Sequence, residues 1–285
     1  MLRRVIIVVC ALLVAISFAC NSGPRSAPDG PVTRIVSLAP NLTEIVFAVG
    51  AGNKLVGRTS YCDYPPEAKA VAEVGDTLHP SLERIIALKP QVVLVSTSSQ
   101  LEVFTQQLHN QNIAVVVSDP RDLDGIFKSI QQIGEITGQK AQAEQLVSKL
   151  RERVNAVEQA VKNRAPVRVF YQVSAEPLYT AGHDAFVTDL MRRAGAASVT
   201  ADVPGAWPKY STESALAAKP EAIILPTGGS MGSVNSDVTE ALRQSPAVVQ
   251  GHVYKINDDY LTRPGPRAID GLEAMARALH PDAFK

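Results

Sequence analysis

The stretch that decides the fold occurs twice. Residues 81–90 read SLERIIALKP and residues 211–220 read STESALAAKP, and each leads into an apolar run, VVLV in the first case and AIIL in the second. Ser, Glu, Ala, Lys and Pro recur at the same offsets, 130 residues apart. A capping Ser, an acid in the first turn and a terminating Pro are typical of a short helix that ends before a buried strand. The repeat therefore indicates a chain of two similarly built halves.

Short apolar strands alternate with helices in both halves. In the first half the pattern predicts strands near 34–38, 55–56, 92–96 and 113–117, with helices near 41–50, 81–89 and 100–109. In the second half it predicts strands near 167–173, 222–225 and 252–256, with helices near 185–194 and 267–279. In the first helix, Asn41 is expected to be the N-cap and Glu44 to complete a capping box. This alternation is typical of parallel α/β sheets.

A helix-rich stretch separates the two halves. A helix at 122–137 ends at Gly138, and residues 139–163 then contain neither Gly nor Pro. A helix of that length would be about 37 Å long and stiff. We therefore expect two Rossmann-like α/β lobes, at 34–138 and 164–285, joined by one long rigid α-helix at 139–163.

The first 33 residues are not expected to be part of either lobe. Residues 1–19 have a basic start and an apolar run at 5–16 that is too short to span a bilayer comfortably, which predicts a signal peptide. Cys20 follows directly and resembles the lipidated cysteine of a bacterial lipobox, although Ser17 stands where Leu is usual. Ordinary cleavage after Ala19 is the alternative. Residues 20–33 are rich in Pro, Gly and Ser and predict a flexible tether, after which Cys62 is the only thiol, so no internal disulfide is expected.

Composition argues against several functional classes. Lys and Arg together number 28, as do Asp and Glu, and no basic block stands out, so a nucleic-acid binder is not expected. The turn after the first strand reads Ala39-Pro40-Asn41 where a nucleotide-binding protein would have a Gly-rich loop. The five histidines lack the spacing of metal ligands, so no metal site is predicted.

One motif supports an enzymatic alternative. Residues 228–232 fit G-x-S-x-G around Ser230, and Asp259 and His280 follow in the order of a serine hydrolase. However, Pro226-Thr227 precede the motif and residues 234–236 delay the next helix, whereas a hydrolase needs a sharp turn between strand and helix. We therefore favour a flexible loop, and a secreted serine hydrolase remains the alternative from another functional class.

The two glutamates of the repeat have two interpretations. Glu83 and Glu213 each lie in the first turn of a helix, where an acid complements the helix dipole by about 0.3–1 kcal/mol. Equivalent surface carboxylates on two lobes would also make a natural pair of docking contacts for arginines on a partner. Spacing alone leaves both interpretations open.

Aromatic residues follow the predicted strands of both lobes. The segment 59–66 reads TSYCDYPP and contains Tyr61, while Trp207 lies in the loop 205–208 and residues 258–263 read DDYLTR. Ligand crevices of α/β proteins form at the carboxyl ends of strands. Aromatic faces with a few polar groups are expected there in a cleft that holds a large flat ligand.

Several segments also resemble a known family. RIVSLAPNLTEIVFAVG at 34–50, TSYCDYPPEA at 59–68, SLERIIALKP and the Trp207-Pro208 loop are similar to the class III solute-binding proteins of ABC importers, and among them to the vitamin B12-binding proteins. The resemblance covers the chain from Arg34 onward. It implies the class III periplasmic-binding-protein fold and a binding protein rather than an enzyme.

The resemblance also implies roles for individual residues. Tyr61, Trp207 and the loop with Asp259, Tyr260 and Arg263 would contact a corrinoid such as cobalamin, and Asn41 would line the floor of the cleft. Glu83 and Glu213 would meet arginines on the permease.

Partners and ligand follow from the same resemblance. The partners would be an ABC permease and its ATPase subunits, and the chain would act as an exported monomer in the periplasm or at the cell surface. The alternatives within the class are haem, with Tyr61 as an iron ligand and Arg263 or Arg267 pairing with propionates, and an iron–siderophore.

Overall fold

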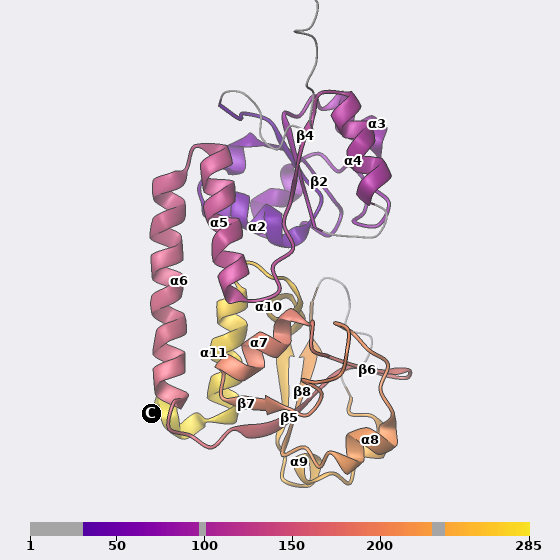
Figure 1. Ribbon diagram of the computed structural model, residues 1–285, viewed down its shortest axis with the longest axis vertical. Helices are drawn as coiled ribbons and strands as arrows, with labels where there is room; N and C mark the ends of the chain where they lie inside the picture. The colour runs from indigo at the N-terminus through magenta and orange to yellow at the C-terminus, as the bar shows by residue number, and fades with distance from the viewer. Residues whose placement is uncertain (1–30, 97–100, 230–236) are drawn as a thin grey trace, which may run out of the picture.

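The fold consists of two α/β lobes and a single long helix that runs along both of them (Figure 1). The computed structural model describes residues 31–96, 101–229 and 237–285. Cys20 and the predicted signal peptide lie outside the described residues. Within them, no helix combines the length and apolar character needed to cross a membrane.

The N-terminal lobe contains a four-stranded parallel sheet in the order β2-β1-β3-β4. The strands are β1 (Ile35–Ser37), β2 (Leu55–Arg58), β3 (Val92–Val95) and β4 (Ala114–Val117). The helices of this lobe are α2 (Pro40–Ala48), α3 (Leu82–Ala87), α4 (Leu101–Asn110) and α5 (Leu123–Thr137). Every residue of β1 and β3 is buried, as expected for parallel strands covered on both faces.

The C-terminal lobe repeats this plan. Its parallel strands run in the equivalent order β7-β5-β8-β9, with a short antiparallel strand β6 beside the end of β5. The strands are β5 (Val167–Ala175), β6 (Leu178–Thr180), β7 (Ala196–Ser198), β8 (Ala222–Thr227) and β9 (Val253–Asn257). The helices are α7 (Phe186–Arg193), α8 (Thr212–Ala217), α9 (Pro246–Val249), α10 (Asp258–Thr262) and α11 (Ala268–Leu279). Short 3-10 turns occur at Gly52–Lys54, Pro66–Ala70, Glu240–Leu242 and Pro281–Phe284.

The sequence repeat is a structural repeat. Helix α3 precedes β3 and helix α8 precedes β8, so each decapeptide occupies the same place in its lobe. Ser81 Oγ accepts from the backbone N–H of Arg84 at 3.4 Å, and Ser211 Oγ accepts from that of Ser214 at 3.1 Å. Both predicted Ser caps are therefore confirmed, as are two α/β lobes of the Rossmann type.

The predicted capping box at the first helix is wrong. Helix α2 begins at Pro40, the N-cap position is Ala39, and no side chain caps it. Proline is well suited to the first helical position, because it has no N–H to satisfy and its φ angle is already helical. Asn41 and Glu44 therefore lie inside the helix, and both side chains bind groups of the other lobe.

The linking helix is α6 (Lys140–Val161), which at 22 residues is about 33 Å long. Its buried residues recur every three or four positions and form one face: Ala143, Val147, Leu150, Val154, Val157 and Val161. This face packs against α5 of the N-terminal lobe and α11 of the C-terminal lobe. Arg153 of α6 also donates to Asp270 at 2.6 Å and to Glu273 at 2.8 Å, both on α11. The helix is thus attached to both lobes along its length.

Candidate functional site

The two lobes meet through segments that follow the carboxyl ends of their strands. Helix α2 follows β1 and the turn 59–65 follows β2, while α10 and the turn 263–267 follow β9. Asn41 Nδ2 donates to the backbone carbonyl of Pro264 at 3.2 Å across this junction, where α10 is labelled in Figure 1. The carboxyl ends of parallel strands are where α/β proteins bind ligands.

Five charged side chains join the lobes at this junction, and we call them the interlobe ion cluster: Glu44, Asp63, Asp259, Arg263 and Arg267. Arg263 Nη1 donates to Asp63 Oδ1 of the other lobe at 2.9 Å and lies 3.6 Å from Glu44 Oε1. Its Nε lies 3.0 Å from Asp259 Oδ1 within its own lobe. Arg267 binds Glu44 through two parallel hydrogen bonds, of 2.9 Å from Nε and 2.5 Å from Nη2.

Aromatic rings cover part of the cluster. The Arg267 guanidinium lies 3.9 Å from the ring centroid of Tyr64 in the N-terminal lobe and 5.4 Å from that of Tyr260 in the C-terminal lobe. A guanidinium that pairs bidentately with a carboxylate and stacks on an aromatic ring has a single preferred orientation. Arg267 of the C-terminal lobe therefore holds Glu44 and Tyr64 of the N-terminal lobe in a fixed position.

Burial changes the titration of two carboxyl groups here. Burial raises the pKa of Glu44 above its ordinary value, and the hydrogen bond and charge of Arg267 offset this only in part. Burial likewise raises the pKa of Asp258, which precedes Asp259 at the start of α10. Both shifts favour the neutral acid, because a buried charge loses hydration.

One N–H donor of the cluster has no hydrogen-bond acceptor among the described residues. Arg263 is only 6% exposed, and among residues 31–96, 101–229 and 237–285 its Nη2 atom has no hydrogen-bond partner. Buried donors in folded proteins are nearly always paired, and an exception calls for an explanation. A ligand acceptor at the interlobe junction would supply one.

The predicted ligand residues lie in two groups. Asn41, Asp259, Tyr260 and Arg263 gather at the interlobe ion cluster, where all but Tyr260 are buried. Tyr61 is half-buried in the same turn as Asp63.

Trp207 forms the second group with a residue of β5. Its side chain is 42% exposed, and its ring centroid lies 6.3 Å from that of Tyr171. The hydroxyl of Tyr171 is buried and has no partner among the described residues. Burial and, to a smaller degree, the charge of Asp258 raise the pKa of Tyr171 well above its ordinary value.

The sequence did not predict the roles that four residues have in this site. Glu44 was assigned to a helix cap, Asp63 and Tyr64 were given no role of their own, and Arg267 was considered only as a haem contact. A signal was present in the sequence. Asn41 and Glu44 are three residues apart on one helix and therefore lie on one face, and Arg263 and Arg267 have a similar spacing.

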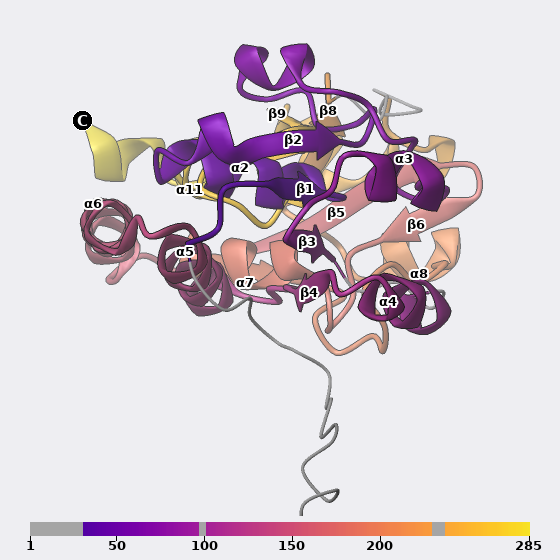
Figure 2. The same cartoon turned by 90° about the horizontal axis from the view of Figure 1, so that it is seen from above.

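The two glutamates of the repeat lie away from this junction. Glu83 on α3 and Glu213 on α8 are both exposed. Both helices lie on the side of the molecule opposite the linking helix α6, in Figure 1 and in the view of Figure 2. Ser211 Oγ donates to Glu213 Oε2 at 2.7 Å, and this hydrogen bond lowers the pKa of Glu213.

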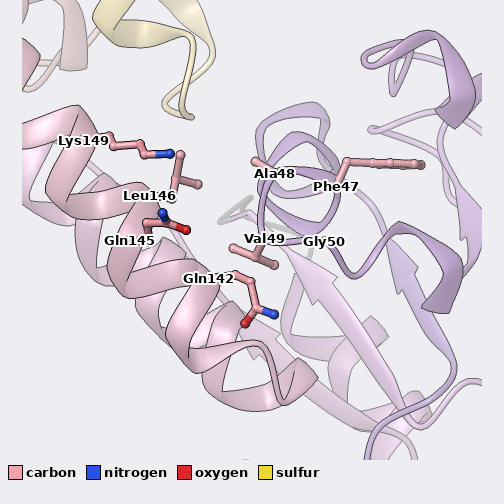
Figure 3. A pocket seen from close by; sticks show the side chains of 8 residues that line it. All are labelled: Phe47, Ala48, Val49, Gly50, Gln142, Gln145, Leu146 and Lys149. Carbon is pink, nitrogen blue, oxygen red and sulfur yellow. The ribbon is translucent and has the colours of Figure 1, made fainter.

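Two pockets adjoin helix α2. One, of about 270 Å³, lies between residues 47–50 and the linking helix, from which Gln142, Gln145, Leu146 and Lys149 line it (Figure 3). The other, of about 530 Å³, is formed by residues of both lobes and is lined by Glu44, Phe47, Ala48, Tyr64, Pro65, Glu67, Pro266 and Arg267. Neither pocket is lined by the residues predicted to contact a corrinoid, but the second shares Glu44 and Arg267 with the interlobe ion cluster, and Arg267 is the alternative haem contact.

The members of the hydrolase alternative are not brought together. Ser230 lies outside the described residues. Asp259 pairs with Arg263 at the start of α10, whereas the His280 ring binds the backbone carbonyl of Gly195 at 3.0 Å, beyond the end of α11. Gly271 of α11 packs against Tyr260, and the nine residues from there to His280 span about 14 Å of helix. Asp259 is therefore in no position to orient His280.

Known proteins match the chain over most of its length. A family model described as periplasmic binding protein matches residues 35–260. YvrC of Bacillus subtilis, an uncharacterized substrate-binding lipoprotein of an ABC transporter, is 34% identical over 259 residues, covering 88% of this chain and 81% of its own. The vitamin B12-binding protein of Pectobacterium atrosepticum is 32% identical over 251 residues, covering 86% of this chain and 88% of its own.

Solved structures share the fold. The periplasmic vitamin B12-binding protein BtuF of Vibrio cholerae has a TM-score of 0.78 at 27% identity, covering 90% of this chain and 99% of its own. The periplasmic heme-binding protein RhuT of Roseiflexus sp. RS-1 also has a TM-score of 0.78, at 25% identity, covering 89% of this chain and 100% of its own. The chain therefore belongs to the periplasmic binding protein family, as a class III solute-binding protein of ABC transporters close to the vitamin B12-binding proteins.

Proposed function

We propose that this protein captures a corrinoid between its two lobes and delivers it to the permease of an ABC importer, whose ATPase subunits drive uptake. The observation that carries the choice of ligand class is the charge of the interlobe ion cluster. Its described members are three carboxylates and two guanidinium groups, and each guanidinium already has a carboxylate partner. The cluster thus has no spare positive charge.

This charge favours a corrinoid over haem. A corrinoid presents neutral amide groups at its edge, which can accept a hydrogen bond from Arg263 Nη2 without bringing a charge. Haem would bring two propionates next to Asp63 and Asp259, and like charges in a poorly hydrated site repel strongly. The similarity to vitamin B12-binding proteins supports the same ligand, and the similarity to a heme-binding protein makes haem the alternative to test.

Ligand identity can be tested by titration. The ligand-free protein is titrated with cyanocobalamin and, in parallel, with haemin, while binding heat and the fluorescence of Trp207, the only tryptophan, are recorded. We expect saturable binding of cyanocobalamin with quenching of Trp207. In Trp207→Phe the fluorescence signal is lost, whereas the binding heat remains. Saturable binding of haemin without binding of cyanocobalamin would show that the protein is a haem carrier.

We further propose that Glu83 and Glu213 are the docking contacts for the permease. Each is exposed on a short helix, and the two helices occupy the same place in their lobes on the side opposite α6. The double variant Glu83→Ala, Glu213→Ala should retain the ligand affinity of the wild type, because neither residue belongs to the interlobe junction. Stability should fall by no more than about 2 kcal/mol for two helix-terminal acids.

Uptake through the cognate permease should drop severely in that double variant. Each single variant should already be impaired if each lobe meets one half of the permease, and replacement by Lys should be worse because like charges would then face each other. Normal uptake by the double variant at equal protein level would contradict the docking role.

We also propose that Cys20 carries a lipid that holds the protein at the membrane, with residues 20–33 as the tether. The relative YvrC is described as a lipoprotein, which supports this proposal. Cys20→Ala should then be exported and freely released. Release of the wild type without a lipid, with Cys20 as its first residue, would contradict it.

A further inference from the structure

Each helix that carries a proposed docking glutamate is held at its carboxyl end by an arginine from the first strand segment of its own lobe. Arg34, just before β1, donates to the carbonyl of Leu88 from Nε at 3.0 Å and from Nη2 at 2.5 Å. Its Nε also donates to the carbonyl of Lys89 at 3.2 Å. In the other lobe Arg168, in β5, donates from Nη2 to the carbonyl of Ala218 at 2.5 Å. Leu88 and Ala218 are equivalent positions of the repeat.

The backbone of each arginine is fixed in the same way. The side chain of Gln91 accepts from the Arg34 N–H at 3.2 Å, and Gln91 N–H donates to the Arg34 carbonyl at 2.9 Å. At the equivalent place, the side-chain carboxylate of Glu221 accepts from the Arg168 N–H at 2.9 Å, and the backbone N–H of Glu221 donates to the Arg168 carbonyl at 2.8 Å. The repeat thus extends beyond the two decapeptides to an arginine in each lobe. That arginine lies 50–57 residues earlier in the chain than the carbonyls and the side chain that it contacts.

These helices need support at both ends. Each contains six residues, and a helix that short is not stable alone in water. The Ser cap satisfies its amino end, and the arginine meets the partial negative charge of the last carbonyls at its carboxyl end. Lys89 and Lys219 then leave the helix with φ angles of 47° and 45°, and a proline follows each. With both ends fixed, the direction of the helix is fixed as well.

We propose that Arg34 and Arg168 are positioning residues for docking, because they fix the directions of α3 and α8 and thereby the separation of Glu83 and Glu213. This inference rests on the docking role proposed above for these glutamates. Two contacts on one rigid body must fit a partner at the same time, and a small change of direction in either helix spoils the simultaneous fit.

The number of hydrogen bonds predicts an order of effects. Arg34 makes three hydrogen bonds to the end of α3, whereas Arg168 makes one to the end of α8. Replacement of Arg34 should therefore weaken docking more than replacement of Arg168.

The test is an affinity measurement between two purified proteins. The cognate permease with its ATPase subunits is immobilised in lipid nanodiscs, and binding of this protein is measured without ligand and after loading with cyanocobalamin. Arg34→Ala should raise the Kd for the permease by roughly three- to tenfold, the equivalent of losing about one net hydrogen bond. Arg168→Ala should raise it less, and Arg34→Lys, which keeps a donor, should restore part of the affinity.

Matched controls separate positioning from general damage. Arg277, an exposed arginine of α11 that stacks on Phe284 at 4.9 Å, lies on another part of the lobe from α8, and Arg277→Ala should bind the permease as the wild type does. Affinity for cyanocobalamin should be unchanged in the Arg34 and Arg168 variants. A loss of ligand affinity equal to the loss of docking would reveal general damage and overturn the inference.

Glu83→Ala and Glu213→Ala, measured in the same assay, separate this inference from the proposal beneath it. Weakened docking in the glutamate variants together with wild-type docking in both arginine variants would overturn only the positioning role. Wild-type docking in the glutamate variants would overturn the docking role itself. The positioning role would then fall with it, whatever the arginine variants do.

Discussion

Glu44 is a buried carboxylate whose partners come from the other lobe. It is 3% exposed, yet it binds Arg267, which is 223 residues away in the chain. Burial raises its pKa more than the two neighbouring guanidinium groups lower it. Because the folded protein then holds the proton more tightly than the unfolded chain does, protonation of Glu44 favours the folded state.

This shift predicts a pH dependence that Glu44→Gln removes. The stabilisation from protonating Glu44 is complete below its unfolded pKa, near 4.5, and is lost as the pH rises through its higher folded pKa. We expect the free energy of unfolding of the wild type, relative to that of Glu44→Gln, to fall as the pH rises from about 4 to about 7. Urea unfolding at a series of pH values measures this difference. Glu67→Gln, which removes an exposed carboxylate of the same lobe, is the matched control, and a difference that grows with pH would show that the folded pKa is below the unfolded one.

For single residues, the sequence predicted which ones lie at the interlobe junction better than it predicted what each of them contacts. It selected Asn41, Asp259 and Arg263, which the structure does gather at the junction between the lobes. It assigned Glu44 to a local cap, because a pattern three residues long describes neighbours in the chain and cannot report a contact 223 residues away. Whether the selected residues contact the ligand remains a prediction.

Among the secondary-structure elements, those with strong local signals were predicted from the sequence. The two capped helices of the repeat, the buried strands and the long helix all appear near their expected residues. Strands β6 and β7 and helices α9 and α10 were missed. They contain three, three, four and five residues, which is too short for a periodic pattern, and the two strands are ordered by pairing with β5.

One close contact fixes the packing of the linking helix. Gly134 of α5 faces Ala143 of α6 so closely that a methyl group on Gly134 would overlap the methyl group of Ala143. An alanine at a helix interior position usually gains up to about 1 kcal/mol over glycine, whereas overpacking of a well-packed site costs about 1–3 kcal/mol. Gly134→Ala should therefore destabilise the protein on balance, despite the better helix propensity.

A double-mutant cycle isolates that contact. Ala143→Gly removes the methyl group that the new alanine would overlap, so the double variant Gly134→Ala, Ala143→Gly should lose less stability than the sum of the two single variants. Urea unfolding of all four proteins gives the coupling free energy. Simple additivity would mean that α5 and α6 adjust without strain, and that the contact does not set their packing.

For the whole molecule, the relation between the lobes could not be predicted from the sequence beyond the presence of a long helix. That relation depends on contacts between residues far apart in the chain, of which the interlobe ion cluster is one group. A second group joins α5 and α7, where Asp189 accepts from the Leu123 N–H at 3.2 Å and Arg193 lies 3.5 Å from Asp124. The lobes are thus joined by α6 and by two sets of direct contacts.

This arrangement predicts that ligand binding changes the overall shape very little. Because α6 packs on both lobes and the ion cluster joins them directly, separation of the lobes would have to break buried ion pairs. The radius of gyration in solution should therefore change by less than about 1 Å on saturation with the ligand identified by titration, because the backbone of preorganised proteins moves by only about 1 Å or less on binding. Small-angle X-ray scattering with and without that ligand measures the change.

The double variant Glu44→Ala, Arg267→Ala tests the role of the ion cluster. It removes both partners of the bidentate pair between the lobes, so that neither charge is left without the other, and it should show a larger ligand-dependent change than the wild type. A decrease of several ångströms in the wild type itself would mean that the lobes close like a hinge and that neither α6 nor the ion cluster holds them in place.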